Sequence, residues 1–196
     1  MIDRYRTFGL RKHWLEDFLY RLEDWFSNNT LGPVQYQAMK KYLKDANLID
    51  KKGNITSLAK KLSELYRDDK EGVWQIIWLN LCNNSELFRF YCFEIPWGKV
   101  WTKGELVEKI MQRGYAKRTA INAVNALTNT FESSPLGEWF GKKVGKREYL
   151  KQGLKTLSLN ALKYAIESMG EDEEKFSKIF GMNKADISYY LMKLRV

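Results

Sequence analysis

Apolar side chains recur every three or four residues over most of this chain, which predicts a mainly helical protein. The first such run covers residues 14–26 and ends at the turn NNTLGP. A second helix is expected from Pro33, because proline suits the first helical turn, and a third over residues 57–66. Between these two helices, short apolar strands flank a lysine and glycine turn at residues 51–54. This order of elements is typical of a winged helix, so we interpret residues 1–71 as a winged-helix-like unit.

Residues 72–97 are the most apolar part of the chain and contain the sequence GVWQIIWLNLCNNSELFRFYCFEIP. The spacing of Trp74, Ile77 and Trp78 predicts one helix, and Ser85 is a suitable N-cap for a second. Apolar residues occupy almost every side of both helices. We therefore expect this connector to form a core shared by the flanking units, and a surface for a partner protein is the alternative.

Residues 98–155 have the order of elements of a winged helix-turn-helix. Thr102 and Glu105 form a capping box pattern that opens the helix KGELVEKIMQRG, and a short turn leads into a second helix. A basic segment follows, in which a strand near residues 142–145 is expected to pair with one near residues 149–151. We interpret this section as the central winged helix-turn-helix of the protein.

The second helix of this unit, KRTAINAVNALTNTF, carries one polar stripe. At about 100° per residue, Arg118, Asn122, Asn125 and Asn129 fall on one narrow face, while apolar residues gather on the opposite face. Asparagine is a poor helix former, so three asparagines on one face indicate a role for their amides. In the major groove of DNA, Asn reads adenine and Arg reads guanine through paired hydrogen bonds. The stripe therefore predicts base contacts, and a solvated helix face is the alternative.

Two groups of residues beside the stripe are expected to contact phosphate. Lys117 and Thr119 stand at the helix start, where backbone amides and the helix dipole favour an anion. The basic segment GKKVGKREYLKQG would form a wing that adds affinity for DNA but little choice of sequence. Its candidate phosphate contacts are Lys142, Lys143, Lys146 and Arg147.

Residues 156–196 form a C-terminal helical unit, in which a helix over residues 159–169 precedes the acidic break GEDEE. The segment KFSKIFGMNKADISYYLMKLR then has Gly181 at a turn and the spacing of a compact helix-turn-helix. Asp186 would set a carboxylate beside any bound phosphate, so we expect packing between domains or subunits, with DNA contact as the alternative. The positions expected to face inward are Phe176, Phe180, Met182, Ile187 and Tyr190.

The charge of the chain favours polyanionic partners. It has 33 Lys and Arg against 24 Asp and Glu, a net charge of +9, and the excess leans toward the C-terminal half. Such a charge attracts DNA or acidic lipid alike. A spanning helix needs about 18 consecutive apolar residues, and no run approaches that length. Because the N-terminus also lacks the apolar core of a signal peptide, we expect a cytoplasmic protein that contacts no membrane.

The chemistry of an enzyme is missing from the sequence. There is no phosphate-binding glycine loop, no dinucleotide fingerprint and no nucleophile elbow. Cys82 and Cys92 are expected to be buried free thiols, and with His13 they are too few for an ordinary zinc site. We therefore expect neither catalysis nor a cofactor or metal. Aromatic residues among the basic positions of the central unit are expected in the core, with stacking of single-stranded bases as the alternative: Trp97, Trp101, Tyr115 and Trp139.

Three stretches give the chain a resemblance to a prokaryotic family of unknown function: FGLRKHWLEDFLY, WQIIWLNLCNNSELFRFYCFEIPWGKVWTKGEL and RTAINAVNALTNTFESSPLGEW. The resemblance covers about residues 6–140. Members of that family resemble accessory domains found beside, or fused to, phosphoadenosine-phosphosulfate-reductase-like enzymes in DNA-modification and phage-defence gene islands. The resemblance implies a partner enzyme or a role in DNA handling. The chain lacks the SGGKDS-type pyrophosphate loop of the reductase-like enzymes, so it cannot supply their ATP-dependent chemistry.

These patterns together predict tandem winged-helix units, an apolar linking hairpin and a C-terminal helical unit. The expected function is that of a non-enzymatic accessory protein of a DNA-modification or phage-defence system, which binds duplex DNA through its central winged helix. The alternative is an adaptor for a reductase-like enzyme without its own affinity for DNA. A sensor whose aromatic middle section holds a small ligand is a third possibility. The oligomeric state stays open.

Overall fold

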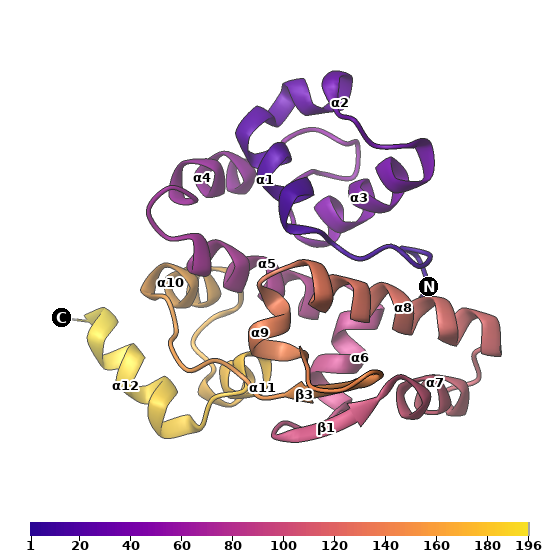
Figure 1. The fold of residues 1–196 in the computed structure, drawn as a ribbon. Coiled ribbons are helices and arrows are strands. Elements are labelled where there is room, and N and C mark those ends of the chain that lie inside the picture. The colour runs from indigo at the N-terminus through magenta and orange to yellow at the C-terminus, as the bar shows by residue number, and fades with distance from the viewer. Residues whose placement is uncertain (196) are drawn as a thin grey trace.

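The computed structural model describes residues 1–195 and confirms the mainly helical class (Figure 1). The N-terminal part contains α1 (Lys12–Arg21), the 3-10 turn η1 (Leu22–Asp24), α2 (Trp25–Asn28), α3 (Pro33–Asp45) and α4 (Ser57–Leu65). The central part contains α5 (Lys70–Asn84), α6 (Glu86–Glu94), β1 (Lys99–Thr102), α7 (Lys103–Gln112), α8 (Lys117–Ser133) and α9 (Leu136–Phe140). The remaining elements are β2 (Lys142–Lys143), β3 (Glu148–Lys151), α10 (Leu159–Met169), α11 (Glu173–Phe180) and α12 (Lys184–Arg195).

Helices α1 to α4 form an upper layer above the rest of the molecule in Figure 1. The single helix predicted over residues 14–26 is interrupted at Leu22, which has a φ of 50° and leads into η1 and α2. The short strands predicted on both sides of the Lys51 turn reduce to one antiparallel bridge between Ile49 and Ile55. The turn is therefore present, but it is held by little regular pairing.

The first residues of the chain are fixed to this layer by Asp45, a buried carboxylate at the end of α3. Arg4 forms an ion pair with Asp45 at 3.0 Å, and the Tyr5 hydroxyl donates to the same carboxylate. The Tyr5 ring also stacks on Tyr42, with 3.9 Å between the ring centroids. Burial raises the pKa of the Asp45 carboxyl, although the hydrogen bond from Tyr5 and the charge of Arg4 oppose that rise. The N-terminal segment is thus anchored by both charge and stacking.

Helix α5 is the centre of the molecule, because every residue from Gly72 to Cys82 is buried. Trp78 stacks on Phe140 of α9 at 4.1 Å, and its indole N–H donates to the carbonyl of Ile179 in α11 at 2.7 Å. These contacts place α5 in a core that it shares with α9 and α11. Both thiols, on Cys82 and Cys92, are free and buried, as expected.

A three-stranded antiparallel sheet with the order β1-β3-β2 closes the central unit. The pairing of Lys142 and Lys143 with β3 is the predicted basic hairpin. Strand β1 pairs along the other edge of β3, and the Trp101 ring stacks on Tyr149 at 4.7 Å. Thr102 caps α7 in the predicted capping box with Glu105.

Lys151, at the end of β3, is completely buried. Its ammonium donates to the carbonyls of Tyr91, Cys92 and Ile95, at 2.7, 2.9 and 2.6 Å. It also lies 4.0 Å from the centre of the Trp97 ring. A cation placed on the last carbonyls of a helix satisfies both their lone pairs and the helix dipole. Lys151 therefore joins the sheet to the C-terminal end of α6.

The C-terminal unit has the predicted helix-turn-helix spacing. Gly181, in the left-handed conformation with a φ of 65°, ends α11, and α12 begins at Lys184. Leu154, beyond the sheet, donates its amide to the carbonyl of Phe180 at 2.8 Å, which ties this turn to the central unit. Of the predicted inward positions, Tyr190 is half-buried, and four are buried: Phe176, Phe180, Met182 and Ile187.

Candidate nucleic-acid interface

The polar stripe of α8 lies at the surface along its length, and its last member, Asn129, is exposed. Arg118 is exposed, and Asn122 and Asn125 are half-buried. Asn125 has one neighbour on α7, because the Lys103 ammonium lies 3.4 Å from its amide oxygen. The opposite face of α8, which includes Val124 and Leu127, packs into the core. Amphipathic winding thus turns these amides outward, as the sequence predicts.

The last third of α8 is held by the N-terminal segment. The Asn129 amide donates to the carbonyl of Thr7 at 2.7 Å. Next to it, the Thr130 hydroxyl accepts the backbone amide of Leu10 at 2.9 Å. Gly9 lies so close that a β-carbon there would be 2.2 Å from the backbone nitrogen of Thr130. Asn129 therefore tethers two parts of the chain, a role that its place in the stripe did not reveal.

The four predicted wing cations fall into two pairs. Lys142 forms an ion pair with Glu138 at 3.4 Å, and Lys143 forms one with Glu132 at 2.9 Å. Lys146 and Arg147 lie in the turn of the hairpin, are exposed, and have no acidic partner within 4 Å among residues 1–195. The hairpin tip is thus the part of the wing whose charge is available to a ligand.

Glu132 connects α8 to the hairpin, because its carboxylate accepts hydrogen bonds from both Lys143 and Tyr149. Burial acts to raise the pKa of Glu132, but the hydrogen bonds from Tyr149 and Lys143 outweigh burial and lower it. Burial and the same carboxylate raise the pKa of the Tyr149 hydroxyl. Glu132 therefore stays ionised and fixes the hairpin against the outer side of α8.

Lys103 belongs to the same surface and was not among the predicted site residues. Burial lowers its pKa, and its electrostatic neighbours include Glu132, Lys143 and Arg147. The sequence did contain an indication, since Lys103 occupies the first residue of α7, where the helix dipole disfavours a cation. A lysine at such a position needs another partner, here Asn125.

The predicted phosphate contacts at the helix start are accessible. Lys117 is exposed, Thr119 is half-buried, and α8 begins without a side-chain cap on Ala116. Residues 98–151 carry eleven basic and five acidic side chains, so this quarter of the chain holds most of its net charge. The candidate interface thus combines amides, free cations and a positive field.

The aromatic residues of this unit are used mainly for packing. Trp101 is buried, and the half-buried Trp97 donates its indole N–H to the carbonyl of Lys178 at 3.0 Å. The Tyr115 hydroxyl donates a hydrogen bond to the Glu86 carboxylate. Trp139 is half-buried and lines a pocket. The expected preference for the core is confirmed for Trp101.

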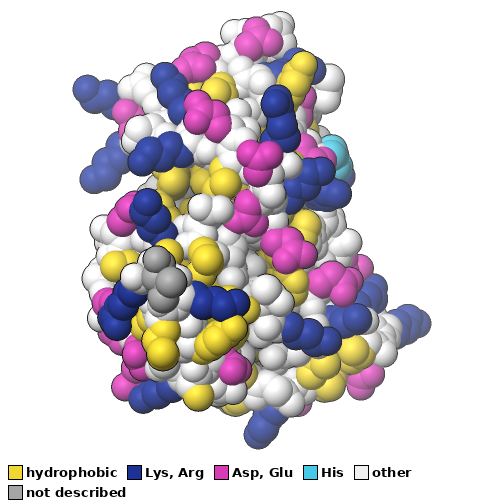
Figure 2. Space-filling view, turned by 90° about the vertical axis from the view of Figure 1, so that its left-hand side faces the viewer, with side chains coloured by type: hydrophobic (Ala, Val, Ile, Leu, Met, Phe, Trp, Pro, Cys, Tyr) yellow, Lys and Arg dark blue, Asp and Glu magenta, His cyan; other side chains and the backbone are white. Residues whose placement is uncertain are grey.

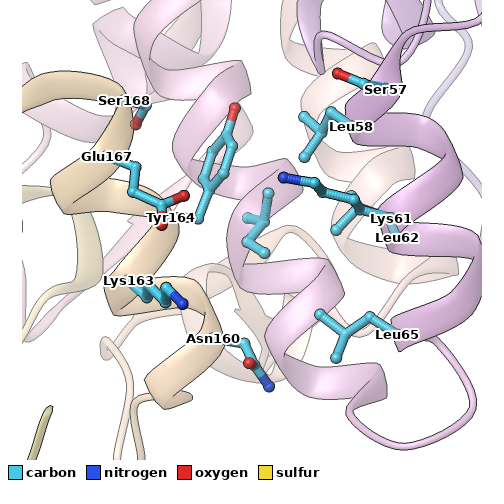
Figure 3. Close-up of a pocket in the computed structure, with 11 residues that line it drawn as sticks. Ser57, Leu58, Lys61, Leu62, Leu65, Asn160, Lys163, Tyr164, Glu167 and Ser168 are labelled. Carbon is cyan, nitrogen blue, oxygen red and sulfur yellow. The ribbon is translucent and has the colours of Figure 1, made fainter.

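A groove of about 360 Å³ lies between α4 and α10, and Ile76 of α5 also lines it. Figure 3 shows leucines on the α4 side, and Lys61, Lys163 and Tyr164 directed into the space between the helices. Tyr164 already donates to the amide oxygen of Asn80 at 3.0 Å, and Glu167 also lines the groove. The hydroxyl of Tyr164 is therefore already hydrogen-bonded within the protein.

No protein-family model matches the chain, and neither a curated protein nor a solved structure matches it. Over the described residues, no helix combines the length and hydrophobicity needed to cross a bilayer. Within residues 1–195, no group of three or more His, Cys, Asp or Glu side chains is arranged to hold a metal ion.

Proposed function

We propose that the protein binds duplex DNA through α8 and the β2–β3 hairpin. The observation that supports this most directly is the combination, on one surface, of the outward amides of Asn122 and Asn125 with the cations of the hairpin tip, which have no acidic partner among residues 1–195. Amides offer a donor and an acceptor to base edges, and cations neutralise phosphate. The same surface carries the positive excess of the chain.

The topology supports this proposal. The order α6, β1, α7, α8, α9, β2, β3, with strands arranged β1-β3-β2, resembles that of a winged helix, which places its second helix beside a hairpin wing, with the short helix α9 added between α8 and β2. In that arrangement α8 is the recognition helix. Arg118, Asn122 and Asn125 would meet base edges, while Lys117 and Thr119 would meet phosphate at the helix start. Asn129 is assigned to the tether with Thr7 instead.

We expect Lys146 and Arg147 to contribute more to DNA binding than Lys142 and Lys143, which already have acidic partners. Replacing Lys146 and Arg147 together by Ala is expected to weaken binding to any duplex by about tenfold. The slope of the logarithm of the binding constant against the logarithm of the salt concentration should fall by the amount expected for about two phosphate contacts. Lys142→Ala should have a smaller effect, because Glu138 already neutralises that amine. Fluorescence anisotropy with a labelled duplex at several salt concentrations measures both quantities.

The matched control is the double change Lys51→Ala and Lys52→Ala, which removes the same charge from an exposed turn of the N-terminal unit. That variant should retain nearly all of the affinity. Equal losses from both pairs would mean that general attraction to a basic surface, not the hairpin, accounts for binding. Absence of any duplex affinity at low salt would end the proposal.

We further propose that this DNA binding serves a modification or phage-defence system as an accessory activity without catalysis, the role implied by the family resemblance. An adaptor for a reductase-like enzyme is the second candidate. It is favoured by two exposed apolar side chains on the same surface, Ile121 on α8 at 39% and Val144 at the hairpin at 50%. Capture of such an enzyme by the purified protein, lost on Ile121→Glu, together with no duplex affinity, would establish the adaptor.

A further inference from the structure

Helix α12 has apolar residues on its outer face as well as its inner one. Ile187 and Leu191 are buried on the inner side. On the outer side Ala185, Tyr189 and Met192 follow each other at spacings of four and three residues, so they form one stripe. Tyr189 is 53% exposed and Met192 is 66% exposed. Figure 2 shows hydrophobic side chains gathered on this face of the molecule, with cations beside them.

The charges around this stripe do not suit DNA. Residues 170–195 carry five basic and five acidic side chains, so the unit is neutral overall. Several of its cations are paired within the unit, such as Lys178 with Glu174 at 2.8 Å and Arg195 with Glu171 at 2.5 Å. A neutral surface with an apolar centre favours contact with protein over a polyanion.

Two charges remain at the edges of the stripe, and they have opposite signs at opposite ends. Asp186 lies near the start of α12, where its carboxylate accepts the side-chain amide of Asn183 at 2.7 Å. Lys193 lies near the end of α12, where its ammonium is 4.7 Å from the centre of the Tyr189 ring, and both charged side chains are exposed. When two copies of α12 pack antiparallel about a two-fold axis at Tyr189, Asp186 of each copy faces Lys193 of the other. The same register sets Ala185 of each copy against Met192 of the other. Such reciprocal pairing is the condition that an isologous interface must meet.

We propose that α12 is a self-association surface, on which a second copy of this chain packs antiparallel through the outer stripe. The stripe is only about 10 Å long, so the dimer is weak, with a dissociation constant of about 10 to 100 µM. A two-fold dimer carries two α8 helices, one on each copy. The inference does not depend on DNA binding, because it rests on α12 alone.

Sedimentation velocity of the full chain over a wide concentration range tests this inference. The wild type should show a monomer–dimer equilibrium, and Met192→Glu should raise the dissociation constant at least about tenfold, because it places carboxylates in the apolar contact. Lys193→Glu should also weaken the dimer, since the new carboxylate faces Asp186 of the other copy. The double change Asp186→Lys and Lys193→Glu should restore association, which a folding defect would not do.

Met111→Glu is the matched control, because Met111 is 39% exposed on α7, at the end of the molecule away from α12 (Figure 1). This control should sediment like the wild type. A wild type that stays monomeric at every concentration would overturn the inference, as would failure of the double charge exchange to restore the dimer. Loss of duplex binding by Met192→Glu with unchanged sedimentation would also overturn it, and would assign the face to DNA.

Discussion

Lys151→Met is expected to lower the free energy of unfolding by about 3 to 5 kcal/mol. Methionine nearly matches the length of the lysine stem, so the main change is the loss of three N–H donors. The carbonyls of Tyr91, Cys92 and Ile95 would then be left in an apolar interior without those partners. Each unsatisfied carbonyl costs about 1 to 3 kcal/mol, and relief from burying a charge offsets part of that sum.

The effect of Lys151 on stability should depend on pH. Burial lowers the pKa of its ammonium from 10.5 to about 8. Between pH 8 and 10.5 the unfolded chain holds a proton that the folded protein has released, so the unfolding free energy rises with pH in this window. The difference between wild type and Lys151→Met should therefore grow by about 3 kcal/mol across the window and stay constant below it.

Urea denaturation followed by tryptophan fluorescence measures both effects. Lys155→Met is the control, because it makes the same change at an exposed position four residues away. That variant should unfold within about 0.5 kcal/mol of the wild type. If Lys151→Met were equally harmless, the ammonium would not be the group that joins the sheet to α6.

Gly9→Ala is expected to destabilise the protein by about 3 kcal/mol. The added methyl group would lie 2.2 Å from the backbone nitrogen of Thr130 and 2.3 Å from the carbonyl carbon of Asn129. A helix backbone cannot yield as a side-chain tip can, so the N-terminal segment must lift away from α8. That movement breaks the hydrogen bonds of Leu10 and Thr7 with the helix.

The control for Gly9→Ala is Gly104→Ala in α7, where the nearest atom to the new methyl group is the Thr102 hydroxyl oxygen at 3.8 Å. This change should stabilise the protein by about 0.5 to 1 kcal/mol, because alanine loses less entropy in a helix. Hydrogen exchange should show faster exchange at the last turns of α8 in Gly9→Ala alone. Unaltered exchange there would contradict the proposed contact.

Local chemistry explains what could be predicted from the sequence. The capping box of Thr102 and Glu105, the basic hairpin and the turn at Gly181 each depend on residues within a few positions of one another. The burial of α5 from Gly72 to Cys82 followed from the lack of a polar face over those residues. The outward amides of Asn122 and Asn125 followed from helical periodicity alone.

Contacts distant in sequence explain what was missed. The partner of Asn129 is 122 positions away at Thr7, so nothing in the α8 sequence distinguishes this tether from a base-reading amide. In the sequence, Lys151 cannot be told apart from the other cations of the basic segment. Its carbonyl acceptors lie about 60 positions earlier in the chain, so its burial could not be predicted. Ion pairing of Lys142 and Lys143 likewise depends on how α8 and α9 pack against the hairpin.

The central position of α5 has a consequence for synthesis on the ribosome. Trp78 of α5 stacks on Phe140 and donates to the carbonyl of Ile179, and both of these residues are synthesised much later than α5. Until nearly the whole chain has emerged, a helix with no polar face remains uncovered in the nascent polypeptide. Such surface recruits chaperones and favours aggregation, so this protein should depend on chaperone capacity during translation more than its native surface suggests.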